Sequence, residues 1–371
     1  MKRILHLMRN TNFTKGVVKY YDKFFNDGQH EICYITSSKN KGKLISPQCN
    51  IAQTEFLSDG SRFDKIRTLI KYIREYDYIV LHSLGCLEDF GRYACLLPKS
   101  IFRKKFVWIE WGGDLYTKRN SKVTEALRNR VRKSVNTVVA IFPPDVDIYK
   151  KKFPNSKAKV FYAPYNGGTI IPQYYNNIYD KPKLAVHDSG SPVYIQVGNN
   201  AKKEHNHIKT LSDLEKFKDE NIVIFMPLSY GSDKEYADKV EEYAVSLFGK
   251  EKTLALRQMM ERKAYFELLD KIDIAIFNTK RQIGLGNINS LIWQKTKIYM
   301  QTDNPMFGYF HDNGVSICDY NDIAKSDFNK FCKPQDDYNE EKFSKYIYER
   351  THLEVGVKKW QNVYDSLPER K

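Results

Sequence analysis

The sequence predicts an α/β protein made of two doubly wound, Rossmann-like domains with parallel sheets. Short apolar segments alternate with longer helical patterns along the whole chain, which favours parallel strands joined by crossover helices. Residues 163–192, rich in Pro, Gly, Asn and Tyr, divide this alternation into two series. The chain of 371 residues, 42% of them hydrophobic, is long enough for two cores. We therefore expect domains at residues 1–165 and 190–340, with closing helices at 341–371.

The apolar runs predict the strands in order. In the first series they lie at residues 4–8, 31–36, 78–82, 106–111 and 137–142. In the second series they lie at residues 193–197, 222–226, 272–277 and 297–301. The tail has apolar residues at helical spacing and is expected to break at Gly356. In folds of this kind ligands bind at the carboxyl ends of the strands, so we expect a ligand cleft there, between the domains.

Composition excludes several classes of protein. No apolar run approaches the ~18 residues of a membrane span, and Met1–Leu7 is too short for a signal-peptide core, so a soluble, cytosolic protein is expected. The 6 cysteines form no C-x-x-C pair, which favours reduced thiols over disulfides or zinc. The net charge of +15 is concentrated in residues 98–160, which predicts a basic face on the first domain.

A phosphate site is indicated after the strand at residues 272–277. The segment Lys280–Asn287 carries Arg281, Gln282, Gly284, Gly286 and Asn287 and leads into a helix at 288–293. A glycine-bearing loop before a helix N-terminus offers backbone N–H groups to a phosphate, and an arginine fork matches phosphate oxygens. A tight strand-to-helix turn explains the glycines equally well.

In the first domain, Trp111, Gly112, Gly113 and Asp114 follow the strand at residues 106–111. The glycines allow close backbone approach, and Asp114 is a candidate proton acceptor or, alternatively, a helix cap. Glu110 is expected to be a structural partner.

In the second domain, Gly198 and Asn199 follow a strand, and His205 and His207 come next. This pattern suits an anionic ligand, with His207 as a hydrogen-bond donor or, alternatively, a cap. The two histidines have no evident third ligand, so no metal is assigned. Asp145 and Asp147 resemble a D-x-D metal motif, but after two prolines they are interpreted as a helix start.

Two more candidates come from the second series. Tyr230 can stack on a nucleotide base or simply pin its loop. Glu261, expected on a helix before the strand at 272–277, can bind a sugar hydroxyl or be a surface charge.

A basic amphipathic helix is predicted at residues 121–136. Its apolar residues recur every four positions, and Arg128, Arg130 and Arg132 lie among them. Residues 99–133 thus form a basic patch of the kind that attracts an anionic membrane surface. Such patches equally attract nucleic acid. In most helices of this kind, however, the apolar stripe packs in the core and the charged side chains are simply solvated.

The ordered segments resemble the TDP-N-acetylfucosamine:lipid II N-acetylfucosaminyltransferase family, which is 4-alpha-L-fucosyltransferase-like, over about residues 108–305. The family's W-G-A-D-L-Y pattern stands here as Trp111–Tyr116, with alanine replaced by Gly113. The remaining matches are Gly198-Asn199 with His207, Pro227 with Tyr230 and Tyr236, Glu261 with Ala264-Tyr265, Arg281–Gly286, and Asn304-Pro305. The sequence also departs from the family at Asn200, Ala201, Ser229 and through its first hundred residues.

The resemblance implies a GT-B glycosyltransferase without cofactor or metal. The donor would be a nucleotide diphosphate sugar, TDP-linked and of deoxy or acetamido type such as N-acetylfucosamine or fucose, and the acceptor polyprenyl-diphosphate-linked. The implied place is the cytoplasmic face of the bacterial inner membrane, in surface polysaccharide biosynthesis. Asp114 is then the candidate base, with Glu261 second. The alternatives are a polysaccharide pyruvyl transferase and a basic nucleic-acid-binding protein.

Overall fold

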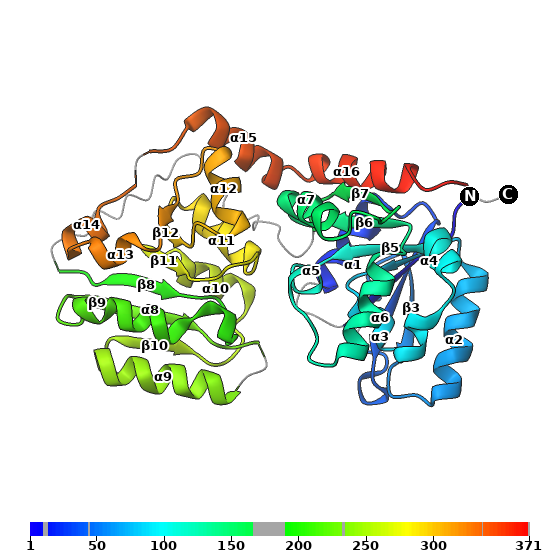
Figure 1. Ribbon diagram of the computed structural model, residues 1–371, viewed down its shortest axis with the longest axis horizontal. Coiled ribbons are helices and arrows are strands. Elements are labelled where there is room, and N and C mark those ends of the chain that lie inside the picture. The colour runs from blue at the N-terminus through cyan, green and yellow to red at the C-terminus, as the bar shows by residue number, and fades with distance from the viewer. Residues whose placement is uncertain (10–13, 44, 166–189, 232–233, 336, 370–371) are drawn as a thin grey trace. The chain divides into compact units, whose positions relative to one another are not determined.

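The computed structural model describes residues 1–9, 14–43, 45–165, 190–231, 234–335 and 337–369. The chain divides into two compact units, one of Met1–Ile170 with His352–Lys371 and one of Ile171–Thr351 (Figure 1). Most of the predicted linker, residues 166–189, lies outside the described residues.

The first unit holds a seven-stranded parallel sheet in the order β3-β2-β1-β4-β5-β6-β7. Its strands are β1 (Ile4–Arg9), β2 (His30–Thr36), β3 (Ala52–Leu57), β4 (Tyr78–Leu81), β5 (Phe106–Glu110), β6 (Thr137–Ala140) and β7 (Lys159–Tyr162). The chain builds outward from β1 to β3 and then from β4 to β7, so the strand order reverses between β1 and β4. This reversal is the topological switch point at which such sheets bind ligands.

Both faces of this sheet are covered, because its side chains alternate between two cores. Leu5 and Leu7 face one core, whereas Ile4 and Met8 face the other. The first core is closed by α2 (Arg62–Glu75), α3 (Gly85–Glu88), the 3₁₀ helix η2 (Arg92–Leu96), α4 (Lys99–Lys105), α6 (Lys122–Arg132) and α7 (Pro143–Lys152). The second is closed by α1 (Thr14–Phe24) and α16 (Leu353–Asp365). The short helices η1 (Ser38–Asn40) and α5 (Gly113–Tyr116) complete the unit.

The second unit holds a six-stranded parallel sheet in the order β10-β9-β8-β11-β12-β13. Its strands are β8 (Val193–Val197), β9 (Ile222–Pro227), β10 (Thr253–Leu256), β11 (Ile274–Phe277), β12 (Lys297–Met300) and β13 (Cys318–Asp319). Its helices are η3 (Lys203–His205), α8 (His207–Leu214), η4 (Glu215–Phe217), α9 (Lys234–Phe248), α10 (Arg262–Leu269), α11 (Leu285–Trp293), α12 (Pro305–Asp312), α13 (Asp322–Lys325), α14 (Phe328–Cys332) and α15 (Glu340–Thr351). The switch point lies between β8 and β11.

The predicted α/β class with two doubly wound parallel sheets is confirmed, and every strand predicted from an apolar run is present. The strands that the sequence missed are β3, β7, β10 and β13, the outermost strands of the two sheets. Their residues are mostly half-buried or exposed, so they lack the continuous apolar run of a strand covered on both faces.

The tail forms two helices, and the break between α15 and α16 falls at His352. The predicted interruption at Gly356 is wrong, because Gly356 is a buried residue inside α16. In the second unit, Tyr346 of α15 donates to Asn289 at 2.7 Å. In the first unit, Trp360 of α16 donates to the carbonyl of Pro164 at 2.8 Å.

Among the residues that the structure describes, no helix combines the length and apolar character needed to cross a bilayer.

Candidate active site

In the second unit, the predicted Gly198-Asn199 turn lies at the switch point, directly after β8. Gly198 has a positive φ of 67°, and a Cβ there would lie 2.5 Å from Nε2 of His207. The Gly198 amide donates to the carbonyl of Ile276 in β11 at 3.0 Å, which ties the turn to the neighbouring strand. His207 begins α8. The turn therefore brings the N-terminus of α8 close to the ends of β8 and β11.

The N-terminus of α11 reaches the same place. Gly284 precedes α11 with a φ of 77°, and a Cβ on it would lie 2.7 Å from the side chain of Asn199. Gln196 of β8 donates to Asn287 in the first turn of α11 at 3.0 Å. Asn287 also bonds to the hydroxyl of Tyr265. The first N–H groups of each helix have no intrahelical partner, so two helix N-termini offer donors at one switch point.

Arg281 stands on the loop before α11 and is held by a carboxylate. Its Nε and Nη2 atoms donate to the two carboxylate oxygens of Glu204 at 3.0 and 2.5 Å. This contact holds the pKa of Glu204 below its ordinary value. The Arg281 backbone carbonyl accepts a hydrogen bond from Asn304 at 3.1 Å, and Gln282 beside it is buried. Nη1 of Arg281 donates to the Gln282 carbonyl at 2.9 Å, so these contacts fix the guanidinium and leave the remaining N–H groups of Nη1 and Nη2 for a phosphate.

The histidines of this region are neutral donors. Burial lowers the pKa of His207 to about 4, and its Nδ1 lies 3.3 Å from the hydroxyl of Tyr236. Burial and the neighbouring His207 place the pKa of His205 well below its ordinary value. Within the described residues, no hydrogen-bond partner reaches either ring nitrogen of His205 or Nε2 of His207. A neutral imidazole carries one N–H, so both residues can donate to an anion without being charged.

His205 belonged to the pattern that the sequence predicted for an anionic ligand, but of the two histidines only His207 was given a role as a hydrogen-bond donor. Over the described part of the chain, no group of three or more His, Cys, Asp or Glu side chains is arranged to hold a metal ion.

Tyr230 and Glu261 complete the predicted candidates of this unit. The hydroxyl of Tyr230 accepts from Asn199 at 3.0 Å, and 47% of the residue is exposed. Its ring is therefore tied to the switch point while keeping an accessible face. Glu261 is exposed and stands at the N-cap position of α10, one residue before the helix in which it was expected. Tyr265 of the helix that follows it reaches the site, where its hydroxyl bonds to Asn287.

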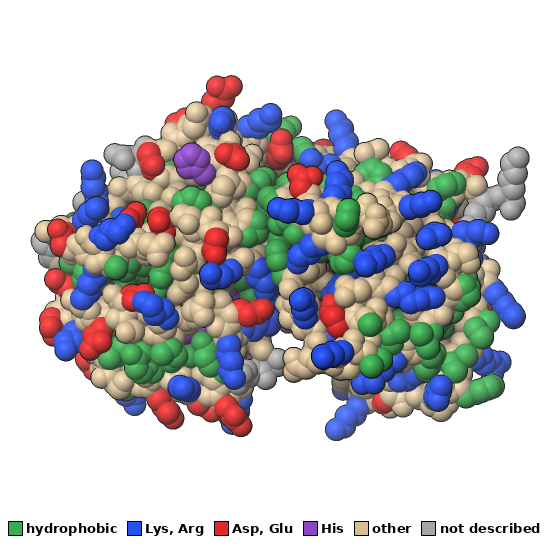
Figure 2. All heavy atoms as spheres, in the orientation of Figure 1, with side chains coloured by type: hydrophobic (Ala, Val, Ile, Leu, Met, Phe, Trp, Pro, Cys, Tyr) green, Lys and Arg blue, Asp and Glu red, His purple; other side chains and the backbone are tan. Residues whose placement is uncertain are grey.

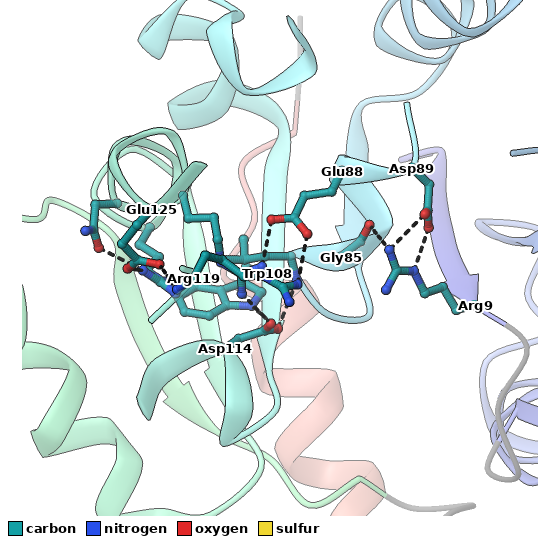
Figure 3. A network of polar contacts seen from close by, with 12 residues as sticks. Arg9, Gly85, Glu88, Asp89, Trp108, Asp114, Arg119 and Glu125 are labelled. Atoms are coloured by element: carbon teal, nitrogen blue, oxygen red, sulfur yellow. Dashed lines mark hydrogen bonds and ion pairs between the residues drawn. The ribbon is translucent and has the colours of Figure 1, made fainter. Parts of the chain in front are cut away.

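In the first unit, Asp114 lies at the carboxyl end of β5, in the network drawn in Figure 3. Its Oδ1 accepts from Nη2 of Arg128 at 2.8 Å, and its Oδ2 accepts from the Leu84 amide at 2.9 Å and the Trp108 indole at 3.4 Å. Arg128 also binds Glu88 at 2.7 Å. The side chain does not cap α5, because Asp114 is that helix's second residue and Gly112 its N-cap.

The residues before Asp114 differ in how closely they are packed. Gly112 is buried, whereas a Cβ on Gly113 would meet no atom within 4 Å. The departure from the family's alanine at Gly113 is therefore sterically neutral. Trp111 is half-buried and packs edge-on against Tyr165 at 4.7 Å between ring centroids.

Glu110 and Asp145 form a buried acidic pair that the sequence did not reveal. Burial, with Asp145 and Asp114 nearby, places the pKa of Glu110 well above its ordinary value, and burial raises that of Asp145 to about 6. Asp145 also accepts from the hydroxyl of Tyr116. Asp145 stands in the first turn of α7, as its interpretation as a helix start predicted.

The prediction that the arginines of α6 form a basic surface is wrong for two of them. Arg128 and Arg132 are 3% and 2% exposed, and Arg132 binds Glu125 at 2.6 Å. Conversely Val123, the first of the apolar residues that recur every four positions in the predicted helix, is 63% exposed. The rest of the predicted stripe, Leu127, Val131 and Val135, does pack on the core, and Arg128 and Arg132 lie inward beside it because carboxylates pair with them there.

The family described as 4-alpha-L-fucosyltransferase, glycosyl transferase group 56, matches residues 74–335. Among solved structures, a glycosyltransferase from Rickettsia africae ESF-5 is 13% identical with a TM-score of 0.67, covering 100% of this chain and 99% of that one. Anabaena HepE in complex with UDP is 10% identical with a TM-score of 0.64, covering 98% and 100%. Sucrose-phosphate synthase from Thermosynechococcus elongatus is 9% identical with a TM-score of 0.68, covering 99% of each chain.

These likenesses confirm the predicted GT-B fold class, and the family match spans both switch-point regions except for β1 and its loop. The pyruvyl transferase alternative is set aside by the same match. The chain is a glycosyltransferase and belongs to the 4-alpha-L-fucosyltransferase family, glycosyl transferase group 56.

Proposed function

We propose that the protein transfers a deoxy or acetamido sugar, such as N-acetylfucosamine or fucose, from a TDP-linked donor to a polyprenyl-diphosphate-linked acceptor. The assignment of the donor rests on the switch point of the second unit. There, two helix N-termini, the fork of Arg281 and two neutral histidines surround one strand end. Solved structures of HepE contain UDP and UDP-glucose, which supports a nucleotide diphosphate donor for this fold.

In this proposal the donor diphosphate binds the N-terminus of α11 and Arg281, and Tyr230 stacks on the base. An acceptor hydroxyl attacks the anomeric carbon, the bond from that carbon to the diphosphate oxygen breaks, and the nucleotide diphosphate leaves. Fixed N–H dipoles and the guanidinium stabilise the charge that develops on the leaving group, and no metal is assigned.

Asp114 is the proposed general base, with Glu261 as the second candidate. A carboxylate has about four lone-pair positions, and three donors occupy positions on Asp114. One position on Oδ1 is left for the proton of the acceptor hydroxyl, while the other contacts hold the carboxylate in a single orientation.

The acceptor would be held by the first unit, at the cytoplasmic face of the bacterial inner membrane, during surface polysaccharide assembly. The basic charge of this unit suits an anionic bilayer and the diphosphate of the acceptor.

The direct experiment incubates the protein with a panel of TDP- and UDP-linked sugars and a polyprenyl-diphosphate-linked acceptor, and identifies products by mass spectrometry. Transfer from TDP-linked deoxy or acetamido sugars is expected. A product from UDP-glucose alone would overturn the donor assignment.

The diphosphate site is tested separately by donor binding to Arg281→Ala. Hydrogen bonds to charged groups contribute about 1.5–3 kcal/mol, so affinity should fall roughly 10- to 150-fold. Lys280→Ala is the matched control, since Lys280 is exposed and pairs with Asp303. Unchanged donor affinity in Arg281→Ala would remove the assignment.

A further inference from the structure

The outer side of helix α2 in the first unit carries apolar residues that the core does not use. Phe63, Arg67, Ile70 and Arg74 follow one another at helical spacing and are all exposed, Phe63 at 72% and Ile70 at 42%. The opposite side of α2 is the one that packs inward, through Leu69 and Tyr72. A second, exposed apolar stripe on a helix indicates a surface that is buried against a binding partner or a membrane.

Neighbouring elements extend this surface. At the start of α2 the carbonyl of Arg62 accepts a hydrogen bond from Tyr93 of η2 at 3.3 Å, and the Arg62 guanidinium lies over the Tyr93 ring at 5.3 Å. Leu96 of η2 is 60% exposed. At the other end of α2, Lys105 of α4 donates to the carbonyl of Tyr76 at 2.5 Å. We call the outer side of α2, η2 and α4 the α2 face.

The α2 face is strongly basic. Its exposed cations are Arg62, Arg67, Lys71, Arg74, Arg92, Lys99, Arg103 and Lys104. Its exposed acids are Asp64 and Glu75, and Lys71 lies 3.9 Å from Glu75. Figure 2 shows hydrophobic side chains interspersed with lysines and arginines on the side of this unit that carries α2.

We propose that the α2 face binds an anionic lipid bilayer, with Phe63, Ile70 and Leu96 entering the headgroup region and the surrounding arginines and lysines contacting lipid phosphates. Apolar side chains that enter the headgroup region and cations that contact anionic lipids both strengthen binding at a bilayer interface. Nucleic acid would attract the cations but gain nothing from an exposed isoleucine and leucine. This inference rests on the proposed function for its biological sense. It keeps α4 from the predicted contact at residues 99–133 and replaces α6, whose Arg128 and Arg132 are buried, by α2 and η2.

Binding is measured by co-sedimentation of the full chain with vesicles of phosphatidylglycerol and phosphatidylethanolamine, and with vesicles of phosphatidylcholine alone. The wild type should bind the anionic vesicles at least 10-fold more tightly, with affinity falling as salt rises. Phe63→Ser with Ile70→Ser should lower that affinity at least 10-fold, and Arg67→Glu with Arg74→Glu should do the same.

Matched controls come from helix α9 of the second unit, where Val245 and Lys239 are likewise exposed. Val245→Ser and Lys239→Glu should bind vesicles like the wild type. Thermal unfolding of every variant identifies any loss of fold. Wild-type affinity in both α2 variants, or tighter binding of RNA or DNA than of anionic vesicles, would overturn the proposal.

Transfer activity separates this inference from the proposed function. With a short-chain, water-soluble acceptor, the α2 variants should transfer sugar at the wild-type rate, and with acceptor embedded in anionic vesicles at least 10-fold more slowly. If the wild type binds vesicles through the α2 face but transfers sugar to neither acceptor, the acceptor assignment fails while the membrane surface stands. If it transfers to both and the α2 variants match it on vesicles, only the membrane surface fails.

Discussion

Arg128 and Asp114 form a buried ion pair in the first unit, with Nη2 of Arg128 2.8 Å from Oδ1 of Asp114. The same guanidinium lies 2.7 Å from Glu88, whose other oxygen binds the exposed Arg119 at 3.1 Å. Arg128 is 3% exposed, so its charge is balanced by protein carboxylates with little help from water. The orientation of Asp114 therefore depends on a residue 14 positions later in the chain.

Arg128→Met should lower the free energy of unfolding by about 3–5 kcal/mol, because it leaves a buried carboxylate without its partner. Arg119→Met is the matched control: it removes a partner of the same Glu88 at the surface and should cost no more than about 1 kcal/mol. Urea unfolding at pH 7 measures both. Similar losses in the two variants would show that burial does not set the strength of this pair.

Asp114→Asn tests the proposed base. The amide oxygen can still accept hydrogen bonds while losing its basicity, so kcat should fall by about 10²–10⁴-fold with little change in the KM of the donor. Glu261→Gln, at an exposed helix cap, should leave kcat within a few-fold. Full transfer activity in Asp114→Asn would remove the assignment, and a large loss in Glu261→Gln alone would move the base to Glu261.

Gly284→Ala should damage the site of the second unit through the backbone. The φ of 77° costs an alanine about 1–2 kcal/mol, and its Cβ would lie 2.7 Å from Asn199, so both stability and donor affinity should fall. Gly308→Ala is the control, because a Cβ there meets no atom within 4 Å and Gly308 lies inside α12. That substitution should stabilise the protein by about 0.5–1 kcal/mol. Calorimetry and donor titration report on both variants.

The sequence predicted the fold where burial leaves a local signal. β1, β4, β5 and β8 are covered on both faces, so each appears as a continuous apolar run, whereas the outermost strands do not. The glycines at 198 and 284 were recognisable because a positive φ and a close neighbour both demand glycine. The apolar runs and the glycines are visible in the sequence itself, although the residues that crowd the glycines, His207 beside Gly198 and Asn199 beside Gly284, are not adjacent to them in the chain.

The remaining features of the site arise from distant residues. Helical spacing placed Arg128 at the surface, because nothing near it in sequence shows that Glu88 and Asp114 draw it inward. Likewise, Glu204 lies 77 positions before its partner Arg281. Ion pairs between distant segments have no periodicity, so only the folded chain reveals them.

A chain of buried histidines links β1, β2 and the residue that follows β4 in the first unit. Nδ1 of His30 lies 2.9 Å from Nε2 of His6, whose Nδ1 lies 3.0 Å from Nε2 of His82. Nδ1 of His82 lies 2.7 Å from the hydroxyl of Tyr165. Burial lowers the pKa of His30 to about 4 and that of His82 to about 3, and burial together with its two neighbours places that of His6 well below its ordinary value. Neutral imidazoles suit such a chain, because each offers one donor and one acceptor.

The protein should therefore lose stability as the pH falls from about 6.5 to 4. In this range the histidines of the unfolded chain, with a pKa near 6.5, become protonated while those of the folded protein stay neutral. Each such histidine lowers the free energy of unfolding by about 1.4 kcal/mol for each pH unit of the fall. Above pH 6.5 neither state binds the proton, so this contribution is constant. His30→Gln should reduce the slope of unfolding free energy against pH by about one such increment, whatever it does to stability at pH 7. His311→Gln, the same substitution at an exposed position, is the control against which the slope of His30→Gln is compared. An unaltered slope in His30→Gln would mean that His30 takes up its proton in the folded protein as readily as in the unfolded chain.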